Sequence, residues 1–300
     1  MSVLEQVLDK LMTTYREKVP SVSIINKALI AKGVIAVPED IENDHIAFRT
    51  MGVAHLGIQS LEKIFLHYGY KAEDHYVFEK KKLKARWYAP PENKFPRIFI
   101  SELKVAELSE ATQQIIKSYT NEVKADPVDD LNLNDANAVG QFLHSPLWRT
   151  PLSADYKSLL AESEYAAWVI YNRYYLNHYT INVDNLPEGY NNLKDFNTFL
   201  VDIGVVLSDA GGIIKESKDG LLLQSSTVSE LCNATFSAGD QFEIAGSYVE
   251  FAERRVLPEF SHLPKNEIKR IYRREGFEAA NADKIFESTY TSQTKNNKLK

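Results

Sequence analysis

The sequence predicts an α+β fold in which one strand–helix–strand–strand–strand unit occurs twice. Three observations predict it. Segments rich in β-branched and aromatic residues follow that order over residues 43–106, the same order returns over 177–255, and the rest of the chain shows helical spacing of apolar residues. The 44% hydrophobic and 25% charged residues are those of an ordinary globular protein. We therefore expect a single domain, 1–300, with a helical insertion at about 107–176 and a helical tail at about 262–290.

The first third of the chain gives a helix and the first unit. Apolar residues at helical spacing over 2–20 predict an N-terminal helix that ends at Pro20. The segment NDHIAFRT (43–50) reads as a strand, and SLEKIFLHYGY as a short helix with Ser60 as its N-cap. The segments HYVFEK, LKARWYAP and RIFISELKV then read as three strands separated by charged or proline-containing turns.

The remaining elements follow the same logic. The insertion is predicted to hold a helix capped by Ser109, a second helix over 133–145, and one long helix over 153–175. The second unit consists of the strand NHYTINV, the helix NLKDFNTFLVDIG and the strands GIIKES, GLLLQSST and SYVEFAERR. The segment KDG between the first two of these strands is a hairpin signal. From Pro264 the tail is charged and reads as mostly helical.

Composition argues against several classes of partner. The net charge of −6 disfavours nucleic acid, and the single cysteine, Cys232, excludes an internal disulfide framework and a cysteine-rich zinc site. A lone thiol fits a reducing compartment, and the chain has neither a signal-peptide pattern nor a run approaching the roughly 18 apolar residues of a membrane span. We therefore expect a cytoplasmic protein with no membrane partner; its oligomeric state stays open.

Both units begin with a histidine on a strand. Side chains alternate between the faces of a strand, so His45 and Arg49 share a face while Ile46 and Phe48 point to the core. In the second unit His178 lies near the start of the strand and shares its face with Thr180 and Asn182. The repeated placement distinguishes these two histidines from the other five, which we interpret as structural or surface residues: His55, His67, His75, His144 and His262.

A carboxylate on the last strand completes a metal-ligand set. Glu250 in SYVEFAER has core-like neighbours, so three strands each carry one good ligand: His45, His178 and Glu250. Two histidines and one carboxylate form the facial triad of non-haem Fe(II) enzymes, which leaves positions open for substrate and dioxygen. The pattern alone also allows Glu253 or Glu243 in place of Glu250, and Zn, Mn, Co or Ni in place of Fe(2+).

Arg49 lies four residues after His45, about 13 Å along an extended strand. A guanidinium in this place can hold a substrate carboxylate through two parallel hydrogen bonds. The alternative is a salt bridge to a neighbouring acid.

Several segments resemble known families. The twin units with ligands on their strands resemble the vicinal oxygen chelate superfamily. GLLLQSST followed by SYVEFAER resembles the end of 4-hydroxyphenylpyruvate dioxygenases and hydroxymandelate synthases, in which the glutamate of the last strand binds iron; this favours Glu250 over Glu253. DHIAFRTMG, RIFISELKV, NHYTINV and YVEFAERR are more closely similar to the DUF1338 family, over about residues 5–275.

The resemblance to DUF1338, whose characterised members are 2-oxoadipate dioxygenase/decarboxylases, implies a fold and an activity. It implies a curved mixed sheet around a metal site, and conversion of 2-oxoadipate to 2-hydroxyglutarate with O2 consumed and CO2 released, as a step in lysine catabolism. The 2-oxo acid and O2 would be the small-molecule partners and Fe(2+) the cofactor. By resemblance, the metal ligands are His45, His178 and Glu250, the substrate-binding and catalytic arginine is Arg49, and the polar lining is Gln224, Ser225 and Ser226.

Other readings keep the fold and change the chemistry. The three residues of the lining can instead serve turn and strand-edge hydrogen bonds. The same metal ligands holding Zn or Ni could run a glyoxalase-like isomerisation or a hydrolysis. A catalytically inactive binding protein of the same fold is the third reading, and the presence of all three ligand types argues against it.

Overall fold

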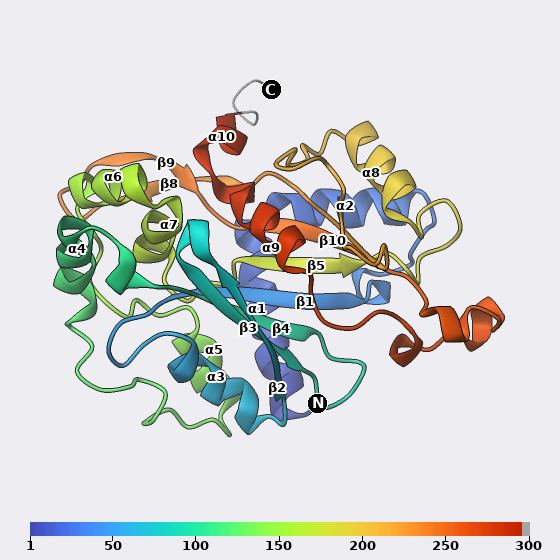
Figure 1. Cartoon of the computed structure of the whole chain (residues 1–300), viewed down its shortest axis with the longest axis horizontal. Helices are drawn as coiled ribbons and strands as arrows, with labels where there is room; N and C mark the ends of the chain where they lie inside the picture. Colours follow the sequence, from blue (N-terminus) through green and yellow to red (C-terminus); the bar gives the residue numbers. More distant parts are fainter. Residues whose placement is uncertain (296–300) are drawn as a thin grey trace.

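Two βαβββ modules lie side by side in one mixed sheet, with strand order β2-β3-β4-β1-β5-β10-β7-β6 (Figure 1). The computed structural model describes residues 1–295. The elements of the first module are β1 (Asn43–Met51), α3 (Ile58–His67), β2 (Lys71–Phe78), β3 (Leu83–Ala89) and β4 (Arg97–Leu103). Those of the second are β5 (His178–Asn182), α8 (Leu193–Asp202), β6 (Lys215–Glu216), β7 (Leu222–Ser226) and β10 (Tyr248–Arg254).

The first strands of the two modules meet at the centre of the sheet. β1 and β5 pair antiparallel, with Ala47 opposite His178. Within each module the first and last strands run parallel, β1 beside β4 and β5 beside β10. The strands turn strongly across the sheet, so that β2 and β3 lie at a steep angle to β5 and β10 (Figure 1). The predicted α+β class, with two βαβββ modules in a curved mixed sheet, is confirmed.

A second, two-stranded sheet interrupts the second module. β8 (Leu231–Thr235) and β9 (Gln241–Ala245) form an antiparallel hairpin between β7 and β10. The sequence did not predict this hairpin, and both strands are partly exposed, so they lack the apolar alternation of the central strands.

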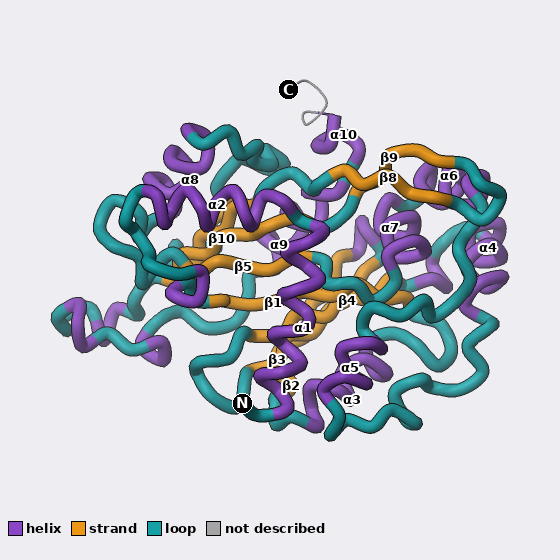
Figure 2. The backbone as a smooth tube through the Cα atoms, turned by 180° about the vertical axis from the view of Figure 1, so that it is seen from behind, coloured by secondary structure: helices purple, strands orange, loops and turns teal. Residues whose placement is uncertain are grey.

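The helices outside the modules cover both faces of the large sheet. Figure 2 shows α1 and α2 in front of the sheet, whereas α9 lies on the opposite face, in front in Figure 1. None of the helices in residues 1–295 is long and apolar enough to cross a membrane. The bounds are α1 (Val3–Lys18), α2 (Pro20–Ala31), α4 (Glu110–Thr120), α5 (Ala136–Phe142), α6 (Ser153–Glu162), α7 (Glu164–Asn172), α9 (Ala279–Ile285) and α10 (Thr291–Thr294).

One helix was missed, and two expectations about helix ends were wrong. Pro20 ends α1 but also opens α2, because a helix does not need the N–H of its first residue. Ser60 lies inside α3 and donates to Asp126, while Gly57 takes the cap position. The helix expected over 153–175 is two helices, because Ser163 has an extended backbone and its hydroxyl accepts the Ala166 N–H at the start of α7.

The tail is less helical than expected. Between Pro258 and Tyr272 it forms three short 3₁₀ turns, and α-helix returns only at Ala279. From there α9 crosses the sheet, and two of its residues, Ala282 and Ile285, line the same cavity as the metal-ligand candidates.

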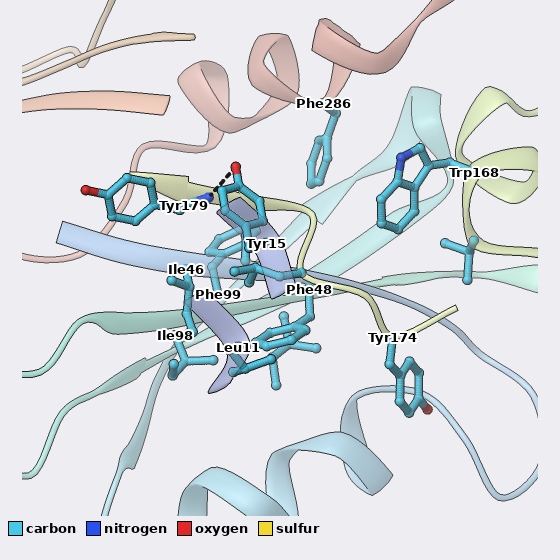
Figure 3. Close-up of a cluster of buried hydrophobic side chains, with 14 of the residues drawn as sticks. Leu11, Tyr15, Ile46, Phe48, Ile98, Phe99, Trp168, Tyr174, Tyr179 and Phe286 are labelled. Carbon is cyan, nitrogen blue, oxygen red and sulfur yellow. Dashed lines mark hydrogen bonds between the residues drawn. The ribbon is translucent and has the colours of Figure 1, made fainter. Parts of the chain in front are cut away.

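The two faces of β1 have different roles. Ile46 and Phe48 point to the α1 side and are buried in the core around Leu11 and Tyr15 (Figure 3). Full burial of such a side chain contributes roughly 1.5–3 kcal/mol, so this face anchors the strand. The Tyr15 hydroxyl accepts the Tyr179 N–H at 3.2 Å and donates to the Tyr248 carbonyl, which ties β5 to β10. The opposite face of β1 is left for polar side chains.

Candidate metal centre

His45, His178 and Glu250 converge from three adjacent strands. His178 is opposite both Ala47 of β1 and Tyr248 of β10, so His45 and Glu250 each lie one same-face step from it. Nε2 of His178 lies 3.3 Å from Nε2 of His45 and 3.1 Å from Oε2 of Glu250, and Nε2 of His45 lies 3.5 Å from Oε1 of Glu250. All three side chains are buried. One ion at the usual 2.0–2.2 Å could touch all three donors.

The charges of the three groups suit a cation. Burial lowers the pKa of His178, which keeps that imidazole neutral. Burial alone would raise the pKa of Glu250, but the two imidazoles hold it well below its usual range, so the carboxylate is ionised. At His45 burial favours the neutral ring, but Glu250 and Asp44 outweigh it and raise the pKa, so an incoming metal ion has to displace a proton from this ring. A neutral histidine and an ionised carboxylate are the forms that bind metal.

Both imidazoles are oriented by the residue that precedes them. His45 donates through Nδ1 to Oδ1 of Asp44 at 2.7 Å, and His178 donates through Nδ1 to Oδ1 of Asn177 at 3.2 Å. In each ring this leaves Nε2 directed at the shared centre, as in known metal sites in which the second ring nitrogen is hydrogen-bonded.

Glu250 is held from the other side. The side-chain amide of Gln224, on β7, donates to Oε1 of Glu250 at 2.6 Å. Asn281 of α9 in turn donates to the side-chain oxygen Oε1 of Gln224 at 3.1 Å. The Thr180 hydroxyl lies 3.1 Å from Nε2 of His45. The carboxylate is therefore fixed before any ion binds.

The cluster opens into a small apolar cavity. Its other walls are Phe99 of β4 and side chains of the C-terminal segment: Phe277, Ala282, Ile285 and Phe286. The Phe277 ring packs edge-on against the His45 ring, with centroids 4.8 Å apart. The cavity measures about 20 Å³ for a water-sized sphere, which is room for about one water molecule. The C-terminal segment thus covers the candidate metal centre.

Arg49 lies farther along the same face of β1 and is 1% exposed. Its Nη1 donates to the Thr289 hydroxyl at 2.9 Å and its Nη2 to the Phe286 carbonyl at 3.0 Å, while Nε has no hydrogen-bond partner in the described part of the chain. The rings of Tyr165 and Trp168 lie 5.1 and 5.2 Å from the guanidinium carbon. Within residues 1–295 no carboxylate forms an ion pair with Arg49, so the salt-bridge alternative is not what the structure shows.

The three polar residues of β7 that were expected to line the substrate site lie on two different faces of the strand. Gln224 lines the cavity, and Ser226 on the same face has its hydroxyl 2.8 Å from that of Ser288. Ser225 points to the other face and donates to Oδ1 of Asn197 on α8 at 2.8 Å. A substrate contact by Ser225 does not fit this placement, because successive strand residues face opposite ways.

The competing ligands lie elsewhere. Glu253 accepts the Leu193 N–H at the start of α8, and Glu243 lies on β9 in the separate hairpin. The remaining histidines do not join the cluster. His67 faces Asn134, His75 faces Arg86, and Nδ1 of His144 faces the Gly140 carbonyl. Of the histidines and acids in the part of the chain that the structure describes, the metal-binding geometry selects one set, His45, His178 and Glu250.

The sequence analysis missed the residues that support the ligands. Asp44 and Asn177 were visible as a polar residue before each histidine, but the pattern gave them no role. Phe277 and Phe286 could not be found, because more than 200 residues separate them from His45 in the chain.

Comparisons with known proteins agree with the resemblance found in the sequence. A family model described as 2-oxoadipate dioxygenase/decarboxylase matches residues 7–263. The 2-oxoadipate dioxygenase/decarboxylase of Arabidopsis thaliana is 40% identical over 308 residues, covering 97% of this chain and 79% of its own. The 2-oxoadipate dioxygenase/decarboxylase of Oryza sativa subsp. japonica is 44% identical over 260 residues, covering 83% of this chain and 70% of its own.

A solved structure is similar over nearly the whole chain. The hydroxyglutarate synthase of Oryza sativa, crystallised in complex with 2-oxoadipate, is 40% identical, with a TM-score of 0.88 over 96% of this chain and 92% of that one. The predicted family resemblance is confirmed.

One prediction is overturned by the same relatives. The Arabidopsis protein is chloroplastic and the rice protein chloroplastic or amyloplastic, which contradicts the expected cytoplasmic location. The lone cysteine was weak evidence, because a reducing environment is not unique to the cytoplasm.

Proposed function

Because this chain belongs to the 2-oxoadipate dioxygenase/decarboxylase family, we propose that it converts 2-oxoadipate to 2-hydroxyglutarate at the centre formed by His45, His178 and Glu250. The reaction consumes one O2 and releases one CO2. One oxygen atom enters the new carboxylate and the other enters the hydroxyl group, so the atoms balance. The observation that carries the proposal is the convergence of three buried candidate ligands beside a small, mostly apolar cavity.

The donor set suits Fe(II). Two imidazoles and one carboxylate take one side of an octahedral ion and leave positions open for a 2-oxo-carboxylate and O2. Fe(II) bound there would supply the dioxygen chemistry, and the protein would orient the substrate and exclude water. Gln224 holds Glu250 in its place. We therefore assign Gln224 the role of positioning Glu250, in preference to a direct contact with the substrate.

Arg49 is the proposed anchor for the far carboxylate of the substrate. It is a buried cation with no ion-pair partner among the described residues, and its guanidinium donates only to neutral oxygens. A buried charge without a counter-charge is costly, and a substrate carboxylate would supply one. Arg49 lies on the same face of β1 as His45, and its charge helps to lower the pKa of His178, which places the guanidinium near the candidate ligands.

Substrate binding requires the C-terminal segment to give way. A cavity of about 20 Å³ cannot hold a six-carbon diacid. The Phe286 carbonyl and the Thr289 hydroxyl occupy the two Nη positions of Arg49. We propose that a carboxylate replaces these two acceptors when the substrate enters.

The test is anaerobic loading with Fe(II), followed by a screen of 2-oxo acids that differ in chain length. We expect 2-oxoadipate to give O2 uptake and CO2 release in a ratio of about one to one. His178→Ala should show neither, while His67→Ala, whose ring lies outside the cluster, should behave as the wild type. Turnover with Zn or Ni and no O2 uptake would instead favour an isomerase or hydrolase, and the lack of any bound metal would favour a binding protein.

A further inference from the structure

The arginines around Asp44 have no part in the proposed reaction, yet they lie directly behind a metal ligand. We propose that Asp44 is a positioning residue for His45, and that Arg254 and Arg97 hold Asp44 in the place where it orients the imidazole. This inference rests on the proposed metal function of His45.

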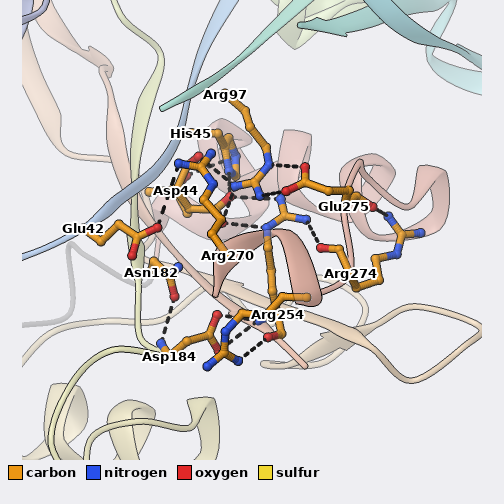
Figure 4. A network of polar contacts seen from close by, with 12 residues as sticks. Glu42, Asp44, His45, Arg97, Asn182, Asp184, Arg254, Arg270, Arg274 and Glu275 are labelled. Atoms are coloured by element: carbon orange, nitrogen blue, oxygen red, sulfur yellow. Dashed lines mark hydrogen bonds and ion pairs between the residues drawn. The ribbon is translucent and has the colours of Figure 1, made fainter. Parts of the chain in front are cut away.

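The hydrogen bonds of Asp44 are fully used. Oδ1 accepts from Nδ1 of His45 at 2.7 Å and from Nη2 of Arg254 at 3.0 Å, and Oδ2 accepts from Nε of Arg254 at 2.6 Å and Nη1 of Arg97 at 3.1 Å (Figure 4). The Arg254 contact is bidentate, which fixes direction as well as distance. A carboxylate held at four points cannot rotate, so the imidazole that donates to it is also fixed.

The group is sealed from water. Asp44, Arg97 and Arg254 are all at most 1% exposed. In such surroundings a charged hydrogen bond is stronger than in water, and loss of one partner leaves the others uncompensated. A surface arginine could not restrain Asp44 as firmly.

The same arginines also hold the segment that covers the metal site. Nε of Arg97 donates to Glu275 at 2.7 Å (Figure 4). Nη1 of Arg254 donates to the Gly276 carbonyl at 2.8 Å. The next residue, Phe277, packs its ring against His45. His45 is therefore fixed from two directions, by the Asp44 carboxylate at Nδ1 and by an aromatic ring whose backbone is held by the same arginines.

The other histidine, His178, also has an aromatic ring against it, that of Tyr248 with centroids 4.8 Å apart, but it has no carboxylate at Nδ1. Behind His178 stands Asn177, a neutral amide at the longer distance of 3.2 Å, whose Nδ2 has no hydrogen-bond partner among residues 1–295. A carboxylate that accepts the second ring N–H of a metal-ligating histidine makes the ring more basic, and so a stronger metal ligand, than an amide does. We infer that His45 is the ligand whose geometry is built in, and that Asp44 determines much of the metal affinity.

The first test is Asp44→Asn, which keeps the shape and removes the charge. Metal affinity, measured by chelator competition with Co(II), should fall by about 10- to 100-fold, the range found for such partners. The visible spectrum of bound Co(II) should change as well, because the His45 ligand is less well fixed. Glu62→Gln is the matched control, since Glu62 is also a partly buried acid that accepts from an arginine, Arg86, but has no contact with the cluster. It should leave affinity and spectrum unchanged.

A second variant covers the case in which Asp44→Asn does not fold. Arg254→Lys keeps the positive charge but loses the two-point contact with Asp44. It should lower Co(II) affinity by a smaller factor than Asp44→Asn and shift the spectrum in the same direction. If the metal-free variants melt at lower temperature while Co(II) affinity and spectrum stay as in the wild type, the network is only structural and the inference is wrong. If the wild-type chain binds no metal, the proposed function itself fails, which is a different result.

Discussion

The two modules share one order of elements and differ in what they bring to the centre. Taken in register, the strand pair β1/β4 of the first module corresponds to β5/β10 of the second, because His45 is opposite Arg97 as His178 is opposite Tyr248. Glu250, the candidate ligand, lies two residues farther along β10, whereas the same step on β4 reaches Phe99, which lines the cavity. The first module therefore supplies one ligand and an apolar wall where a fourth ligand could have been.

The difference accounts for an open side at the candidate site. Four equivalent ligands would surround an ion, whereas three ligands and a phenyl ring leave positions open for substrate. The modules also differ in the residue that lies four positions after the histidine on the first strand. It is Arg49 in the first module and Asn182 in the second, and Asn182 only accepts the Asp184 N–H of a turn. The duplicated fold thus places metal ligands mainly on one module and the proposed substrate contacts on the other.

Removal of a second-module ligand should have the largest effect. His178→Ala is expected to reduce bound metal from about one equivalent per chain to near zero, and turnover with it, because two ligands seldom retain an ion against chelators. Metal analysis after gel filtration measures this. His67→Ala should keep full metal content. Retention of metal by the His178 variant would show that the modules do not share one site.

A change at Arg49 should affect substrate and leave the metal unchanged. Arg49→Lys keeps the charge but loses the planar fork, and a charge-assisted hydrogen bond contributes roughly 1.5–3 kcal/mol. We expect kcat/KM for 2-oxoadipate to fall by at least about tenfold with metal content unchanged.

Asn182→Ala is the matched change in the second module. It should cost some stability through the lost turn contact and leave kcat/KM nearly unchanged. Equal kcat/KM for the wild type and Arg49→Lys would mean that the first module does not bind the substrate through Arg49.

The outer strands differ in a way that pH can reveal. Burial lowers the pKa of Lys215 on β6 to about 8, although Glu250 opposes the shift, whereas the outer strand β2 of the first module is largely exposed. An unfolded lysine has a pKa of about 10.4, so between about pH 8 and 10.4 the unfolded chain binds more protons than the folded one. The free energy of unfolding of the metal-free protein should therefore rise with pH in this window, by on the order of 1–3 kcal/mol.

Lys215→Met removes the titrating group and should flatten that rise. Urea unfolding at several pH values measures it, with Lys157→Met, a lysine on α6 outside the sheet, as the control. A rise of the same size in the Lys215 variant would show that Lys215 is not its source.

The smallest effect should come from Ser225. Its hydroxyl faces α8 and bonds to Asn197, away from the cavity. Ser225→Ala should cost about 1 kcal/mol of stability, because Asn197 loses a donor, and leave kcat/KM within about twofold of the wild type. A large loss of turnover at normal stability would place Ser225 in the substrate site after all.

The sequence predicted the parts of the site that depend on local pattern. Alternation along β1 was enough to place His45 and Arg49 on one face of that strand, and the repeated order of elements paired His45 with His178. The choice of Glu250 over Glu253 needed the family resemblance. Alternation shows that the two glutamates face opposite ways, but it does not show which of the two faces the site.

What the sequence could not predict depends on distant contacts. Asp44 is a common residue before a strand histidine, and its role appears only when Arg254 and Arg97 reach it from two other strands. The cavity wall formed by Phe277 and Phe286 comes from the tail, whose path over the sheet no local pattern determines. Helix α2 was missed because Pro20 is a helix stop and a good first residue at once.

The central claim is that ligands from both modules hold one metal ion. An anomalous-difference map, recorded at the metal edge from crystals of the loaded protein, tests it most directly. The account predicts a single strong peak about 2.0–2.2 Å from Nε2 of His45, Nε2 of His178 and a carboxylate oxygen of Glu250. A peak elsewhere, or a peak that touches ligands of one module alone, would contradict it.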